Sequence, residues 1–115
     1  MYIRKDDMTT ISTDPEHLTL INTFVVAPQR ADELMELLIA ATDDTMRHIP
    51  GFVSANLHIN DDRTRIVNYA QWKSAAAFDA MLERNDAKPH MAAAAEIAES
   101  FEPITYSVVH VEATS

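Results

Sequence analysis

Apolar and polar side chains follow two distinct periods along this 115-residue chain. Alternating or continuous runs of β-branched and apolar residues predict strands over 18–26, 52–59, 65–72 and 104–112. Apolar residues at helical spacing predict one helix over 28–49, which the Pro-Gly pair at 50–51 ends. A second helical region begins after Ser74, is interrupted by Asn85-Asp86 and Pro89, and continues as an alanine-rich segment over 91–100.

The resulting order, β-α-β-β-α-β, is typical of ferredoxin-like α+β domains. In such a domain the helices cover one face of a four-stranded antiparallel sheet and leave the other face bare. Residues 52–59 and 65–72 form a hairpin within that sheet, joined by the polar turn at 60–63. We expect one domain over 17–115, preceded over 1–16 by a flexible N-terminal arm without periodicity.

Both faces of the first strand are apolar, because Leu20 and Phe24 alternate with Ile21 and Val25. The last strand shows the same double pattern. The helices can cover only one face, and an exposed apolar face of that size needs a partner. The chain is therefore expected to form a homodimer through its sheet.

The hairpin strands divide their side chains between two faces. Phe52 is expected on the same face of its strand as His58, with Ala55 on the opposite face. Asn68 and Trp72 share one face of the second strand and lie ~13 Å apart along it.

Acidic residues outnumber basic ones by 18 to 9, which gives a formal net charge of -9. That field repels nucleic-acid backbones and anionic lipid surfaces, so neither is an expected partner. The first 16 residues carry no signal-peptide pattern, and no segment approaches the roughly 20 apolar residues that cross a bilayer. The expected location is the cytoplasm.

The chain has no cysteine and a single glycine, Gly51. Thiolate metal sites and cysteine nucleophiles are excluded, as are the glycine-rich loops that hold dinucleotides and nucleoside triphosphates. The five histidines show no spacing typical of a metal site. We therefore expect chemistry without a metal or a nucleotide-derived cofactor.

Two neighbouring segments carry a family resemblance. Ile-Pro-Gly-Phe-Val-Ser-Ala-Asn-Leu-His over 49–58, followed by Val-Asn-Tyr-Ala-Gln-Trp over 67–72, resembles the antibiotic biosynthesis monooxygenase family of dimeric α+β barrel proteins. The likeness extends over about 18–111. It implies an oxidoreductase that works as a homodimer and uses molecular oxygen as co-substrate, without a cofactor, to convert a phenolic or quinol-type aromatic to a quinone.

The family's fold is shared more widely than its activity. A non-catalytic module that binds an aromatic ligand, a signalling dimer and a haem-degrading relative therefore stay open as alternatives. The haem-degrading branch pairs a strand asparagine and a helix histidine with a helix tryptophan. Asn22 and His90 can fill the first two places, but Met81 stands in the third. This departure disfavours haem oxygenation.

Asn68, Trp72 and His58 are the candidate catalytic residues. The amide and the indole N–H are donors suited to negative charge that develops on an oxidised phenol. The resemblance also places a histidine at position 58, where it can take the phenol proton. The alternative is structural: Trp72 fills the core, Asn68 satisfies a turn or bulge, and His58 is an exposed strand residue.

Asn22, Phe78 and His90 are the candidate pocket residues. His90 lies in a Lys-Pro-His-Met segment similar to the Pro-His that precedes the last helix in family members. Phe78 stands where the polycyclic-phenol oxidases have a tyrosine, so it can form an apolar wall but cannot donate a proton. The structural alternatives are an asparagine paired with backbone and a histidine at a helix start on the surface.

These features predict that the purified protein carries no stoichiometric flavin, haem or metal, because the chain lacks the usual means of holding them. The checks are an absorption spectrum and elemental analysis of protein purified without chelator. A visible absorption band, or one equivalent of a metal, contradicts this prediction.

Overall fold

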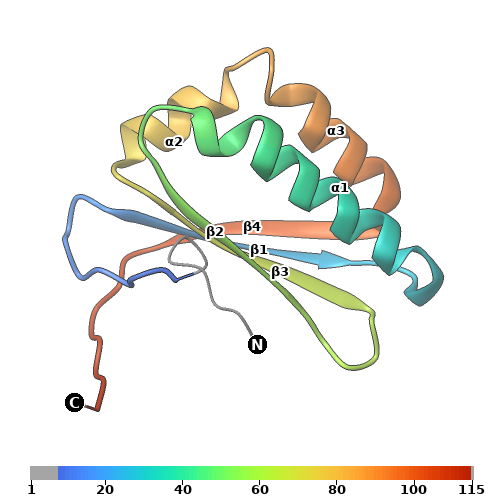
Figure 1. The fold of residues 1–115 in the computed structure, drawn as a ribbon, viewed down its shortest axis with the longest axis horizontal. Coiled ribbons are helices and arrows are strands. Elements are labelled where there is room, and N and C mark those ends of the chain that lie inside the picture. The colour runs from blue at the N-terminus through green and yellow to red at the C-terminus, as the bar shows by residue number, and fades with distance from the viewer. Residues whose placement is uncertain (1–7, 115) are drawn as a thin grey trace.

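The computed structural model describes residues 8–114 and forms two layers, a four-stranded sheet and a set of helices packed on one of its faces (Figure 1). The strands are β1 (Leu18–Val25), β2 (Phe52–Ile59), β3 (Arg65–Trp72) and β4 (Ser100–Tyr106). The helices are α1 (Ala31–Asp44), α2 (Ala75–Leu82) and α3 (Lys88–Ile97), with short 3-10 turns η2 (Pro28–Arg30) and η3 (Met46–His48).

All strand pairs are antiparallel, in the order β2-β3-β1-β4. The predicted ferredoxin-like α+β order is therefore confirmed, with the second helical region divided into α2 and α3. β1 lies at the centre between β3 and β4, and its Asn22 lies opposite Asn68 on one side and Pro103 on the other. This register brings polar residues from separate parts of the sequence to one place.

The helix boundaries follow from local sequence. Asp32 and Glu33 occupy the first turn of α1, where the positive end of the helix dipole favours anions. Leu34 on its inner side is fully buried. At the start of α2, the Ser74 hydroxyl accepts a hydrogen bond from the Ala77 N–H at 3.1 Å, which satisfies a free donor of the first turn.

The prediction for the C-terminal third was wrong at two boundaries. Pro89 lies in the first turn of α3 rather than interrupting a helix, because proline fits where no N–H is needed. The last strand is Ser100–Tyr106 instead of 104–112, since the Glu99 N–H donates to the Val25 carbonyl and brings the chain into the sheet early. Pro103 is tolerated because β4 is an edge strand.

The face predicted for Phe52 was also wrong. The pairing of β2 with β3 skips one residue between Phe52 and Ser54, so a bulge interrupts the simple alternation. Phe52 therefore packs on the helix side, where its ring meets Trp72 edge-on at 5.6 Å. Beyond the bulge the alternation resumes, and Ala55 faces the same side.

The sheet's other face, here called the outer face, carries no helix among the described residues (Figure 1). Apolar and aromatic side chains of three strands lie on it, namely Ile21, Val67, Tyr69, Ile104 and Tyr106. Part of it is reached by the arm, where the Thr9 hydroxyl donates to Asn56 Oδ1 at 3.3 Å. Residues 1–7 of the predicted arm lie outside the described residues.

The longest helix of the described residues, α1, has 14 residues. Within residues 8–114, no helix has both the length and the apolar character needed to cross a membrane.

Gly51 occupies the left-handed region, with φ +89°, and a Cβ there would lie 2.4 Å from the Ala77 Cβ. Gly51→Ala is therefore expected to lower the free energy of unfolding by about 2–4 kcal/mol, through backbone strain and a steric clash. Urea unfolding measures this loss. In an Ala77→Gly background the same substitution should cost less, because the clash is relieved while the positive φ remains. A wild-type unfolding midpoint for Gly51→Ala contradicts the prediction.

Candidate active site

A cavity of about 310 Å³ lies between the helix layer and the sheet. Residues from all four strands line its sheet side, including Leu20, Ala55, Ala70 and Phe101. Residues of α1, η3, α2 and α3 line the helix side, including Leu38, Met46, Met81 and Met91. The walls are mostly aliphatic and aromatic, so the cavity suits an apolar ligand of small-molecule size.

Two amides lie side by side on the sheet side of this cavity. Asn22 of β1 and Asn68 of β3 are directly paired across the strands, and both line the cavity. The Oδ1 atom of each is buried and has no hydrogen-bond partner within the described residues. A buried acceptor without a partner costs about 1–3 kcal/mol. Two such atoms together mark a place where a ligand with hydroxyl groups can bind.

Trp72 lines the same side of the cavity from the end of β3, with only 2% of its surface exposed. Its ring is held between Phe52 at 5.6 Å and Phe78 at 6.3 Å, both in edge contacts. Trp72 is therefore both a core residue and a residue of the cavity wall. Phe78 provides an apolar wall from α2.

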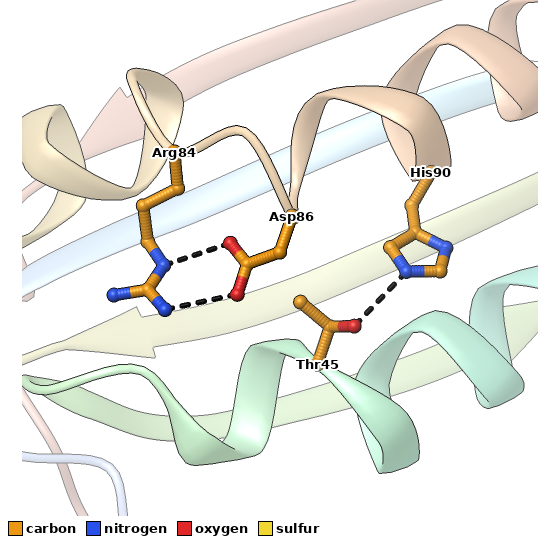
Figure 2. A network of polar contacts seen from close by, with 4 residues as sticks. All are labelled: Thr45, Arg84, Asp86 and His90. Carbon is orange, nitrogen blue, oxygen red and sulfur yellow. Dashed lines mark hydrogen bonds and ion pairs between the residues drawn. The ribbon is translucent and has the colours of Figure 1, made fainter.

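His90 lines the helix side of the cavity from the first turn of α3. Its Nε2 lies 3.0 Å from the hydroxyl oxygen of Thr45, at the end of α1, and Figure 2 shows the two side chains pointing toward each other. The preceding loop is braced by Arg84, whose Nε and Nη2 each donate to Asp86 at 2.9 Å. These bonds lower the pKa of the exposed Asp86 carboxyl, so Asp86 stays ionised and paired with Arg84 except at acidic pH.

His58 does not join the cavity. Leu57 pairs with Asn68, so His58 projects from the next position onto the outer face of the sheet. There it is exposed, and its Nδ1 lies 3.1 Å from the carbonyl oxygen of Asn56. The structure thus brings together Asn22, Asn68, Trp72, Phe78 and His90, but separates His58 from them by the thickness of the sheet.

The family model for antibiotic biosynthesis monooxygenases matches residues 17–97. The chain belongs to this family. It is 48% identical over 83 residues to the tetracenomycin-F1 monooxygenase of Streptomyces glaucescens, a match that covers 72% of this chain and 74% of the relative. Family membership and this relative make the protein an enzyme, a monooxygenase.

Solved structures of antibiotic biosynthesis monooxygenases and related proteins share the fold. A monooxygenase from the gene ActVA-Orf6 of Streptomyces coelicolor, solved with the ligand Nanaomycin D, is 24% identical with a TM-score of 0.77, covering 88% of this chain and 95% of its own. SnoaB, a cofactor-independent oxygenase from Streptomyces nogalater, is 23% identical with a TM-score of 0.70, covering 84% and 96%.

Three residues at or beside this monooxygenase's cavity were not indicated by the sequence patterns: Phe101 and Pro103 on its wall, and Thr45, which contacts the lining residue His90. Phe101 and Pro103 line it because β4 starts earlier than the alternation suggested. Thr45 was missed because it lies in the short break between α1 and η3, where periodicity carries no signal. Only a comparison of the α1 end with the α3 start reveals its contact with His90.

Charge is nearly absent from the cavity of this family member. Among the residues that line it, all within the described part of the chain, His90 is the only one with an ionisable side chain. Within residues 8–114, no three His, Asp or Glu side chains come together in a group that could hold a metal ion. The polar side chains of the cavity wall are therefore two amides, one indole, one imidazole and the hydroxyl of Thr42, which donates to the Leu38 carbonyl.

Proposed function

We propose that this monooxygenase oxidises a phenolic or quinol-type aromatic to a quinone with molecular oxygen and without a metal or flavin. The observation that carries the proposal is the pair of unpartnered amide oxygens of Asn22 and Asn68, beside Trp72, in an otherwise apolar cavity. Apolar walls suit the faces of aromatic rings, and the amides suit oxygen substituents at the ring edge.

The overall reaction balances without an external reductant. A ring carbon that bears hydrogen, para to the phenol hydroxyl, becomes a carbonyl, and the phenol oxygen becomes the second carbonyl. One atom of O₂ enters the ring and the other leaves as water. The substrate supplies all four electrons that reduce O₂, so the protein needs to bind, ionise and shield the substrate rather than carry electrons.

The amides can serve both the neutral and the ionised substrate. Each has an oxygen that accepts from a hydroxyl and an NH₂ that donates to an oxyanion, and a half-turn of the amide exchanges them. The Trp72 indole N–H adds a third donor for charge that develops during oxidation. The similarity to a tetracenomycin-F1 monooxygenase and to a structure holding Nanaomycin D supports a ligand of several fused rings.

The first test removes the donors singly. Trp72→Phe keeps most of the ring bulk and deletes the N–H, and Asn68→Ala removes the amide. Each should lower turnover by ~10² or more with little change in apparent affinity, because the donors act mainly on the transition state. Oxygen uptake and quinone formation with a panel of dihydroxynaphthalenes and anthrones measure this.

The matched control is Asn85→Ala, an exposed asparagine in the turn after α2, which should keep wild-type turnover. Phe78→Tyr should stay active, since it places a donor at the cavity wall. If the wild type turns over a panel member and the Trp72 and Asn68 variants match it within about twofold, the site lies elsewhere.

The second test concerns the proposed homodimer. Apolar residues on the outer face lack a cover in the subunit, and burial against a second copy should remove over ~1,200 Å² in total. Ile104→Glu places a charge on that face at a residue 38% exposed in the subunit, so the subunit should fold but sediment as a monomer. Ile39→Glu on α1, 47% exposed, is the matched control and should remain dimeric. A wild-type protein that sediments as a folded monomer at micromolar concentration contradicts the proposal.

A further inference from the structure

We infer that His90 is the catalytic residue that takes the proton from the phenol hydroxyl, and that Thr45 is the positioning residue that holds its imidazole for this step. The inference rests on the proposed function, because it assumes a phenolic substrate. It assigns to His90 the role that the sequence suggested for His58, which lies on the opposite face of the sheet.

The chemistry requires a proton acceptor inside the cavity. Triplet oxygen takes an electron readily from a phenolate but poorly from a neutral phenol. A free phenol with a pKa near that of tyrosine, about 10, is neutral at pH 7. The formal net charge of -9 also disfavours the arrival of an anion. It must therefore be ionised after it binds.

His90 is the one side chain on the cavity wall suited to this task, among lining residues that all belong to the described part of the chain. Histidine is the residue whose charge ordinarily changes between about pH 5 and 8. The amides of Asn22 and Asn68 are not bases, and the hydroxyl of Thr42 donates to the Leu38 carbonyl at 2.9 Å.

The proton transfer also solves a charge problem. An isolated phenolate in a mostly apolar cavity is costly because it loses its hydration. When the phenol O–H bond breaks and an N–H bond forms on His90, the imidazolium that results is the counter-ion of the phenolate. The net charge of the cavity does not change, and within residues 8–114 no other ionisable side chain lines the wall.

Thr45 contacts one of the two imidazole nitrogens of His90. Its hydroxyl lies 3.0 Å from Nε2 (Figure 2). When an Nε2–H donates to Thr45, Nδ1 is the ring nitrogen that is free to accept the phenol proton. The hydroxyl oxygen can accept from an Nε2–H in both the neutral and the protonated ring, so the contact survives the transfer. In the preceding loop, Arg84 donates two hydrogen bonds to Asp86, so these two charged side chains pair with each other.

The test uses alizarin (1,2-dihydroxyanthraquinone), a three-ring phenol whose neutral and anionic forms absorb at different wavelengths. The dye is titrated with the full-length protein at a pH where the free dye is mostly neutral. The wild type should bind it as the anion. His90→Gln should bind it with similar affinity but with the anionic fraction lowered about tenfold or more, since the proton acceptor is gone.

The variants of Thr45 separate positioning from packing. Thr45→Val keeps the shape and deletes the hydroxyl, so it should lose much of the anionic signal, whereas Thr45→Ser keeps the hydroxyl and should retain it. His48→Gln, at an exposed histidine three residues further on, and His58→Gln, on the outer face, should both bind the anion as the wild type does.

Each remaining outcome decides a different question. If the wild type binds the dye as the neutral form, or His90→Gln binds the anion as well as the wild type, the role of His90 is overturned while the proposed function stands. If Thr45→Val and Thr45→Ser behave alike, the role of Thr45 is overturned. If the wild type does not bind the dye at all, the phenol-binding cavity fails, and the inference fails with it.

Discussion

The site depends on the register between β1 and β3. Eight consecutive pairs, from Leu18 with Trp72 to Val25 with Arg65, fix which side chains of the two central strands lie opposite each other. A slip by one residue would turn every side chain of one strand to the other face. Asn22 would then leave the cavity, and the apolar residues beside it would lose the helices that cover them.

The same register explains why buried polar groups are tolerated at the centre of the domain. Leu20 and Phe24 flank Asn22 on the helix side of β1, and Ala70 and Ile66 flank Asn68 on β3, all four buried. These neighbours supply the packing that offsets the cost of the unpartnered amide oxygens. On the helix side of each strand, the amide of the candidate site therefore lies between two buried residues that stabilise the fold by packing.

The helix layer contributes in a different way. Its apolar stripes close the cavity, while the one ionisable side chain that it contributes to the cavity wall, among the described residues, comes from the place where two helix termini meet. The Thr45 hydroxyl at the end of α1 and His90 Nε2 at the start of α3 lie 3.0 Å apart. A helix terminus can carry such a group because its side chains lie at the edge of the packed interface rather than within it.

The amino-acid sequence by itself determined the element types, their order, and that Asn68 and Trp72 share one face of their strand. These features are local, because the alternation of a strand and the period of a helix follow from backbone geometry within the segment. The family resemblance carried by 49–58 and 67–72 was equally readable, since it depends on residue identity alone.

Only the tertiary structure decided which histidine reaches the cavity. The turn at 60–65, held by Asn60 Oδ1 as acceptor for the Thr64 and Arg65 N–H groups, sets the hairpin register that turns His58 away. The bulge beside Phe52, the early start of β4 and the contact of Thr45 with His90 likewise arise between distant segments. Pairing across strands and packing between helices depend on partners far along the chain, and no pattern within one segment records them.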